Sequence, residues 1–176
     1  KTGTPPRALK SSINWDKTEE DYGDTEPTPF SLFTESFNPK NEPCHTVRTN
    51  MNVHSIITKN ANLSPMYNGE IEGVGPRYCP SIEDKIKRFK HQPSHLLFLE
   101  PEWLKSDQIY INGFSTSLPE QTQIESLKQI PALEKIELLR PGYAIEYDCM
   151  SPSQLKATLE SKQVSGLFFA GQINGT

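Results

Sequence analysis

The chain has 176 residues, a length that fits one domain. Only 34% of the residues are hydrophobic, and the 15 prolines exceed the usual proline share of about 5% of residues. A net charge of −4 excludes a chain that is basic throughout, so any RNA contact would need a local patch. No apolar run approaches the roughly 18 residues of a membrane span, and no signal-peptide pattern is present. We expect a piece of a larger protein whose core is shared with other segments.

The first 50 residues predict mostly turns and loops. The stretches "GTPPR", "TEPTPF" and "FNPKNEP" disfavour helices and central strands alike, because proline lacks a backbone donor and fixes φ. The acidic run from Asp16 to Asp24 predicts a solvated loop. A short helix is expected over residues 52–60, followed by a break at "LSPMYNG".

Three later helices are better marked. The helix after Cys79 has Ile82, Ile86 and Phe89 at helical spacing, with acidic residues in its first turn and basic residues towards its end, an order that suits the helix dipole. The second lies in residues 117–130, where Ser117 and Glu120 have the spacing of a capping box. The third lies in residues 151–162, with Ser151 as cap, Pro152 at the first helical position and Gln154 closing the box.

Five stretches predict strands: residues 95–100, 108–112, 135–139, 143–148 and 166–171. The first two are close enough in sequence to form a hairpin. The last is a continuous apolar run that ends in glycine, which is typical of a buried strand whose carboxyl end meets a ligand. The fold class expected is therefore mixed α/β (α+β).

Cys79 stands where a helix start usually has a capping hydroxyl or carboxylate, and a thiol is a poor cap. Ser81 is an alternative cap, with Asp84 three residues later. The helix N-terminus and Arg77 favour a thiolate, whereas Glu83 and Asp84 oppose it. Two interpretations stay open: a reactive thiol, or a small buried apolar residue.

The other cysteines, Cys44 and Cys149, lie far from Cys79, so neither a zinc site nor a disulfide framework is predicted. Gly73 and Gly75 begin a GxGxxG pattern that fails because Tyr78 replaces its third glycine. What remains is either a glycine-flexed loop able to receive a phosphate at a helix start, or an ordinary loop.

Two further stretches are candidate binding segments. "KIKRFKHQPSH" could contact RNA phosphates through Lys85, Lys87, Arg88, Lys90, His91 and His95, although a solvated helix end is the commoner explanation. "FFAGQINGT" ends in glycines that let the backbone approach a cofactor closely. Such a strand often lies against the flavin in two-dinucleotide flavoproteins, which usually have Asp where this chain has Gln172.

Several of these stretches together resemble the MnmG (GidA) family of tRNA uridine-modifying flavoproteins. They are "KTGTPPR", "SPMYNGEIEGVGPRYCPSIEDKIKRF", "FLEPEWL", "INGFSTSLP", "RPGYAIEYD" and "LESKQVSGLFFAGQINGT". The resemblance runs through nearly the whole chain and is weakest between residues 8 and 50. It implies a flavoenzyme of the bacterial cytoplasm or of an organelle such as the mitochondrion. With the GTPase MnmE, the family adds a carboxymethylaminomethyl or aminomethyl group to C5 of the wobble uridine of certain tRNAs, using FAD, NADH and methylene-tetrahydrofolate.

The resemblance also implies roles for particular residues. Cys79 matches a proposed nucleophile towards the uridine ring, whose addition activates C5. Gln172 is implied as an FAD contact, together with Gly171 and Asn174. The residues implied as NAD contacts are Gly75, Pro76, Arg77, Tyr78, Cys79, Pro80, Ser81, Ile82, Glu83, Asp84, Lys85, Ile86, Lys87, Arg88 and Phe89. Arg77 and Lys85 are carried over only as ligand or RNA contacts.

Compared with the family, the chain lacks the amino-terminal GxGxxG for the FAD pyrophosphate and the helical carboxyl domain, and it has Trp103 where glycine is common and Cys149 where an aromatic residue is usual. We therefore expect the chain by itself to hold no FAD tightly and to be inactive. Its first expected part, residues 1–50, is an irregular, proline-rich part of the FAD domain or of an insertion in it. Residues 51–135 are expected to form an NAD- and tRNA-facing segment with a helix over 80–90 and the hairpin. Residues 136–176 are expected to return to the FAD domain and to end in the flavin-contacting strand.

The family resemblance implies a homodimer in the full-length protein and no membrane association. Two alternatives stay open. One is a folate- and FAD-dependent tRNA uridine methyltransferase, a relative that lacks the long helical carboxyl domain. The other is a non-catalytic module that docks tRNA or a GTPase, for which replacing Cys79 by Ala would have no chemical consequence.

Overall fold

The computed structural model describes residues 1–40, 43–69 and 81–174. These residues divide into two compact units, Lys1–Ala144 and Ile145–Thr176, which are described separately. The mixed α/β class predicted from the sequence is confirmed in the first unit, which holds a six-stranded sheet and three helices.

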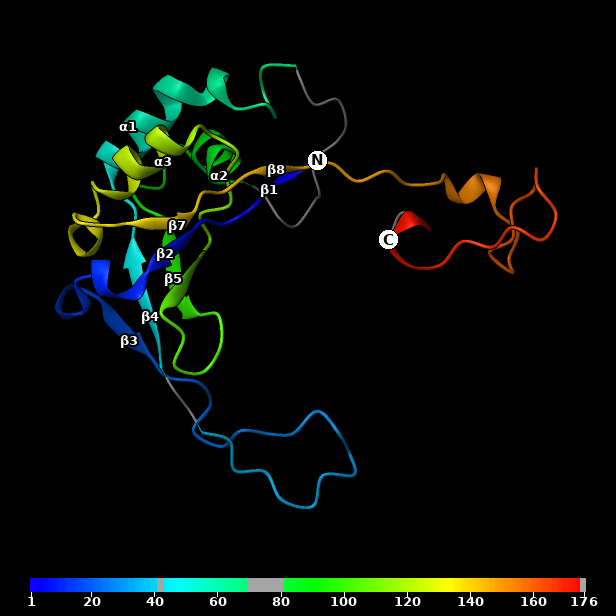
Figure 1. Ribbon diagram of the computed structural model, residues 1–176, viewed down its shortest axis with the longest axis horizontal. Coiled ribbons are helices and arrows are strands. Elements are labelled where there is room, and N and C mark those ends of the chain that lie inside the picture. Colours follow the sequence, from blue (N-terminus) through cyan, green and yellow to red (C-terminus); the bar gives the residue numbers. More distant parts are fainter. Residues whose placement is uncertain (41–42, 70–80, 175–176) are drawn as a thin grey trace. The chain divides into compact units, whose positions relative to one another are not determined.

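The sheet of the first unit is antiparallel throughout and has the order β3-β4-β5-β6-β2-β7 (Figure 1). Its strands are β2 (Arg7–Leu9), β3 (Glu19–Asp21), β4 (Cys44–Arg48), β5 (Leu96–Pro101), β6 (Gln108–Asn112) and β7 (Leu138–Arg140). Two further short strands are β1 (Thr2–Gly3) and β8 (Ala144–Ile145). The predicted hairpin is confirmed as β5 and β6, in a register that runs from Phe98 opposite Asn112 to Pro101 opposite Ile109.

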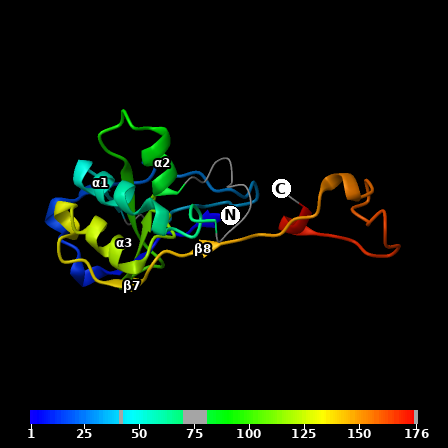
Figure 2. The same ribbon diagram turned by 90° about the horizontal axis from the view of Figure 1, so that it is seen from above.

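The side chains of β5 and β6 alternate as a one-sided sheet requires. Leu97, Leu99, Ile109 and Ile111 are fully buried, whereas their neighbours along each strand are half-buried or exposed. The buried set faces the helices α1 (Met51–Asn60), α2 (Ile82–Arg88) and α3 (Glu120–Leu127), which lie together on one side of the sheet (Figures 1 and 2).

The core of this unit lies between that face of the sheet and the helices. Val53 and Ile57 of α1, Ile82 and Ile86 of α2 and Leu127 of α3 belong to it. Short 3₁₀ turns connect the elements: η1 (Lys10–Ser12), η2 (Trp15–Lys17), η3 (Ala61–Leu63) and η4 (Pro131–Leu133).

The predicted first helix is confirmed as α1, and its start has a local cause. The side chain of Asn50 accepts hydrogen bonds from the backbone N–H groups of Asn52 and Val53 at 3.0 and 3.1 Å. Asparagine is among the best capping residues because its side-chain oxygen satisfies N–H groups that have no partner within the helix.

The start of α2 confirms the alternative cap. The Ser81 hydroxyl accepts a hydrogen bond from the backbone N–H of Asp84 at 3.2 Å. Ile82 and Ile86 are buried as their spacing predicts, but Phe89 is 45% exposed. Phe89 differs because it follows the last helical residue and has left helical geometry, with φ −115° and ψ 49°.

The predicted cap of the second marked helix is wrong. α3 begins at Glu120, and the Ser117 hydroxyl instead pairs with the buried Ser64 hydroxyl at 2.6 Å. Pro119 explains the later start, because a residue before proline is driven out of helical geometry and the helix can form only after it.

The amino-terminal region is mostly irregular as predicted, with no helix or strand over residues 22–40, but it also supplies strands to the sheet. β2 lies between β6 and β7, and β4 lies between β3 and β5. Pro6 and Pro43 stand immediately before these two strands, so neither removes a donor from the ladder. The acidic run is solvated as predicted, but Glu19–Asp21 forms the exposed edge strand β3 rather than a loop.

The strands predicted over 135–139 and 143–148 are present but short, as β7 (Leu138–Arg140) and β8 (Ala144–Ile145). The turn η4 occupies the residues before β7, and Pro141-Gly142 separates the two strands. Strand pairing here starts only where the chain meets β2, with Arg7 opposite Arg140 and Ala8 opposite Leu138.

In the second unit the predicted helix over 151–162 and the predicted strand over 166–171 are both wrong. The 3₁₀ turns η5 (Pro152–Gln154) and η6 (Gly171–Asn174) stand there instead, and the Ser151 hydroxyl bonds that of Ser153 at 2.8 Å. Phe168 is 60% exposed and pairs through a single bridge with Glu160. A buried strand needs neighbouring strands, and so short a unit has too little apolar surface to enclose one.

Candidate functional site

A groove of about 800 Å³ lies between α1 and α2 of the first unit. Its apolar lining comes mainly from Met51, Ile57, Ala61, Tyr67 and Ile86, and its basic side chains are Lys59, Lys87 and Lys90. The sequence forms this groove because α1 and α2 turn their apolar faces to the same core while their last turns carry lysines.

Glu83 places a buried carboxyl beside this groove. It is only 4% exposed, and its Oε1 accepts hydrogen bonds from the Thr116 hydroxyl at 2.8 Å and the Ser117 N–H at 3.5 Å. Oε2 is also buried and has no hydrogen-bond partner among the described residues. Burial raises the pKa of Glu83, and the hydroxyl and N–H groups around it oppose that rise.

Two histidines, His54 and His95, lie next to each other, and His54 is part of the groove lining. The Thr49 hydroxyl is 2.8 Å from Nε2 of His54 and accepts the backbone N–H of His95 at 2.8 Å, and the two rings are 5.2 Å apart. Burial lowers the pKa of both imidazoles, and the charges of His54 and Lys85 lower that of His95 further. Both rings therefore favour the neutral form.

This pair predicts a loss of stability at acid pH. A histidine whose pKa is lowered on folding stabilises the fold fully above its unfolded pKa of 6.5, and this contribution is lost as pH falls through the lower folded value. We expect His54→Gln in the full-length protein to narrow the difference between its thermal unfolding midpoints at pH 7 and pH 5. The exposed His91, changed to Gln, is the matched control. An unchanged difference in His54→Gln contradicts the prediction.

The described residues among those implied as NAD contacts differ in solvent exposure. Ser81, Ile82, Glu83 and Ile86 are buried, Asp84 and Lys85 are half-buried, and Lys87, Arg88 and Phe89 are exposed. Lys85 donates to the carbonyl of Gly113 at 3.1 Å, which ties α2 to the loop after β6. Gly75, Pro76, Arg77, Tyr78, Cys79 and Pro80 lie outside the described residues, so their roles stay predictions.

Sequence reasoning missed the burial of Glu83 and its hydrogen bond with Thr116. It also missed His54 and Tyr67 as residues of the groove. The signal for Glu83 was present, because it lies one residue after Ile82 and three before Ile86, on the same helical face. The partners come from other elements, and nothing local marks them. The Tyr67 hydroxyl lies 3.2 Å from that of Ser81, and burial raises the pKa of Tyr67.

The second unit holds the residues implied as FAD contacts. Gly171 has φ +82° and open space where a side chain would stand, and Gln172 is exposed. Asn174 donates to the carbonyl of Phe169 at 3.1 Å, and its Oδ1 is buried with no partner among the described residues. The open space at Gly171 leaves room for the close approach of a ring system such as a flavin.

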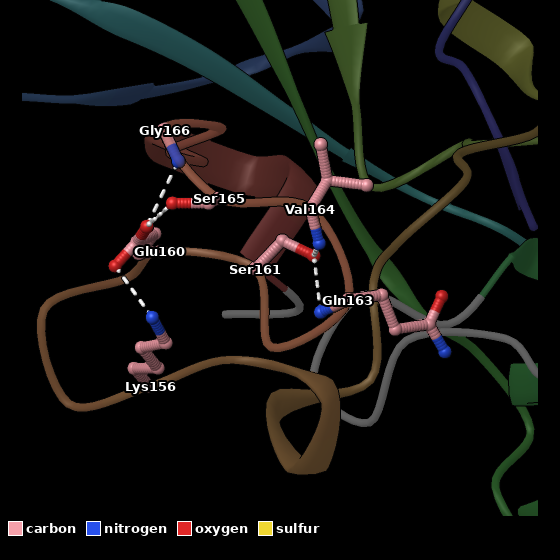
Figure 3. Close-up of polar contacts among 7 residues, drawn as sticks. All are labelled: Lys156, Glu160, Ser161, Gln163, Val164, Ser165 and Gly166. Atoms are coloured by element: carbon pink, nitrogen blue, oxygen red, sulfur yellow. Dashed lines mark hydrogen bonds and ion pairs between the residues drawn. The ribbon is translucent and has the colours of Figure 1, made fainter.

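A polar turn precedes this segment (Figure 3). The Glu160 carboxylate accepts from Lys156 and from the backbone N–H of Gly166, both at 2.8 Å, and the Lys156 contact is the main cause that lowers its pKa. The Ser161 hydroxyl accepts from the N–H groups of Gln163 and Val164. These bonds hold the turn from which the chain continues to Gly171.

The family model for "Glucose inhibited division protein A" matches residues 1–176, the whole chain. The chain belongs to the MnmG (GidA) family. It is 54% identical to the tRNA uridine 5-carboxymethylaminomethyl modification enzyme MnmG of Enterococcus faecalis and 51% identical to that of Campylobacter fetus. Each match covers 100% of this chain but only 28% of the relative.

Solved structures agree with this assignment to the MnmG family. GidA of Aquifex aeolicus in one crystal form is 47% identical, with a TM-score of 0.87, over 99% of this chain and 30% of that chain. A second crystal form gives 43% identity and a TM-score of 0.84. The resemblance read from the sequence motifs is therefore confirmed, and the chain spans less than a third of the length of these relatives.

The described residues contain neither a candidate membrane span nor a candidate metal site. No helix there is long and apolar enough to cross a bilayer. Within the same residues, no group of three or more His, Cys, Asp or Glu side chains could hold a metal ion.

Proposed function

We propose that the protein to which this chain belongs modifies C5 of the wobble uridine in tRNA, adding a carboxymethylaminomethyl or aminomethyl group. The observation that carries this proposal is 54% identity, over the whole chain, to a protein named as a tRNA uridine 5-carboxymethylaminomethyl modification enzyme. The motifs around Cys79 and Gln172, read as family motifs from the sequence, lie within that match.

In this proposal Cys79 acts on the uracil ring. Its thiolate adds to C6, and the electron pair of the C5–C6 double bond moves into the ring carbonyl, which makes C5 nucleophilic. C5 then bonds to an electrophilic one-carbon unit. Loss of the C5 proton to a base and departure of the thiolate from C6 restore the double bond and the free cysteine.

FAD, NADH and methylene-tetrahydrofolate are proposed to supply the redox equivalents and the one-carbon unit. Gly171, Gln172 and Asn174 would contact the flavin, which the open space at Gly171 and the unpaired Asn174 oxygen support. We propose Ser81–Phe89 as part of the nicotinamide-cofactor contact, with Lys87 and Arg88 as its exposed cations.

The partners proposed are tRNA as substrate, the GTPase MnmE and a second copy of the full-length protein. The relatives supporting this are bacterial, which fits action in the bacterial cytoplasm, and an organelle is the alternative location that the family resemblance implies. The name of these relatives supports tRNA directly, whereas MnmE and the homodimer rest on family membership.

The test uses the full-length protein, its partner GTPase and tRNA from cells lacking the modification. We expect a flavin absorbance spectrum in the purified protein and, by mass spectrometry of nucleosides, a carboxymethylaminomethyl or aminomethyl group at the wobble uridine. A 5-methyluridine product would instead support the methyltransferase relative. A protein that carries no flavin and modifies no uridine contradicts the proposal and favours a docking module.

A further inference from the structure

The groove between α1 and α2 shares Glu83, Ile86 and Lys87 with the proposed nicotinamide contact, but no step of the C5 chemistry proposed above uses it. It combines an apolar lining with one buried carboxyl, on Glu83, and three lysines, Lys59, Lys87 and Lys90. All of these residues are described, and none of the three lysines takes part in an ion pair among the described residues. Each property restricts what the groove can bind.

We propose that this groove binds one nucleotide of the substrate RNA other than the target uridine, with its base on the apolar lining, a base N–H on Oε2 of Glu83, and its flanking phosphates on the lysines. This inference rests on the proposed function, because it takes RNA to be the substrate. It adds a second point of contact for the RNA beside the reacting base.

The shape and lining suit a nucleobase. A volume of about 800 Å³ is in the range of small-molecule sites, and the lining is mostly apolar, as such sites are. Tyr67 supplies an aromatic ring whose hydroxyl is held against that of Ser81, so the ring has a fixed position. Single-stranded RNA is commonly bound by stacking unpaired bases on such rings.

Glu83 selects a ligand that carries a hydrogen-bond donor. A buried carboxyl oxygen without a partner costs stability, and a base amino or imino N–H removes this cost when it donates to Oε2. Oε1 is already held by Thr116, which leaves Oε2 as the carboxyl oxygen without a partner among the described residues. Carboxylates accept from base N–H groups in this way in nucleic-acid recognition.

The lysines favour a nucleotide within a strand over a free one. Lys59 belongs to α1, whereas Lys87 lies in α2 and Lys90 just after it, so both walls of the groove carry positive charge. A nucleotide within a strand has one phosphate on each side of its sugar, and a mononucleotide has a phosphate on one side only. A local basic patch of this kind is what a chain of net charge −4 needs in order to bind RNA.

The test measures binding of a fluorescent anticodon stem-loop RNA to the full-length protein at several salt concentrations. We expect the double variant Lys87→Ala/Lys90→Ala to bind about tenfold more weakly, with a salt slope reduced by about 1.5 because two phosphate contacts are lost. The matched control is Lys10→Ala/Lys135→Ala, two exposed lysines outside the groove, which should bind like the wild type.

Glu83→Gln gives an independent arm. Thr116 donates to the group at Oε1, so in the Gln variant the amide oxygen takes that place and the amide NH₂ replaces Oε2. The NH₂ would then meet the N–H of the base, donor against donor. We expect RNA binding weakened about tenfold with an unchanged salt slope. The thermal unfolding midpoint is measured alongside for each variant.

Three outcomes overturn the inference. The first is unchanged affinity and salt slope in the double lysine variant. The second is a raised KM for NADH in that variant with RNA affinity intact, which would make the groove a dinucleotide site. The third is a wild-type protein that binds no RNA, and this result would also remove the proposed function. If uridine modification is retained when the first outcome is observed, the groove inference is wrong and the proposed function still stands.

Discussion

Cys79→Ala in the full-length protein is expected to lose tRNA uridine modification by roughly a thousandfold or more, since removing a nucleophile removes the covalent route. Anaerobic NADH should still bleach the flavin of this variant, because reduction does not require the thiol. The measurement is flavin absorbance under NADH together with the modified nucleoside content of the tRNA.

Two controls make the Cys79 result specific. Cys149→Ala removes an exposed thiol elsewhere in the chain and should leave both reactions intact. Cys79→Ser keeps the size of the side chain but offers a hydroxyl that is hardly ionised, so it should also fail to modify tRNA. If Cys79→Ala abolishes bleaching as well, the residue belongs to the nicotinamide site, and the proposed nucleophilic role is wrong.

Gly142→Ala is expected to destabilise the first unit by about 3 kcal/mol, through steric overlap in a site that cannot expand. A methyl group on Gly142 would press against the carbonyl oxygen of Thr4 and lie 2.9 Å from that of Thr116. The fully buried Gln123 side chain also holds Gly142 on both sides. It accepts the Gly142 N–H at 2.8 Å and donates to the Gly142 carbonyl at 2.8 Å.

The measurement for Gly142→Ala is the thermal unfolding midpoint of the full-length protein. Gly166→Ala is the matched control, because Gly166 has φ +80° but nothing within 4 Å of the added methyl group. The control should cost only the backbone strain, about 1 kcal/mol. Equal midpoints for Gly142→Ala and the wild type would contradict the prediction. They would mean that the backbone of Thr4 and Thr116 can move to make room for the methyl group.

Locally encoded elements could be predicted from the sequence. The hairpin of β5 and β6 follows from alternating apolar residues on either side of a short connection, and α1 follows from periodicity and a capping asparagine. In each case the stabilising contacts join residues that are at most 14 positions apart in the sequence. Propensity and pattern are reliable there, because no distant partner is needed to decide between structures.

Elements that depend on distant partners could not be predicted. β2 has only three residues and follows two prolines, and it becomes a strand because β6 and β7 bond it on both sides. The capping signals at Ser151 and Ser117 are present, but neither side chain caps a helix. The family could be predicted because it is recognised from the residues of long motifs. That recognition does not depend on the secondary structure that each motif forms.

The candidate site was predictable only in part. The basic character of α2 could be read from its lysines, but Glu83 looked like an ordinary acidic residue in a first helical turn. Its carboxyl is buried because Thr116 and Ser117, more than 30 residues later, fold over it. The position of Glu83 on the face of Ile82 and Ile86 is a local signal, but a local pattern cannot identify the distant partners of its carboxyl.

The position of β2 has a consequence for the order in which the protein is made. Arg7 pairs with Tyr110 on one side and Arg140 on the other, and Figure 1 shows this blue strand beside the yellow β7. A ribosome therefore releases β2 about a hundred residues before its first partner exists. The hairpin of β5 and β6 can form as soon as it emerges, but the sheet closes only after Arg140 has left the exit tunnel. Until then β2 has backbone N–H and C=O groups without strand partners, and chaperones or another chain can bind them.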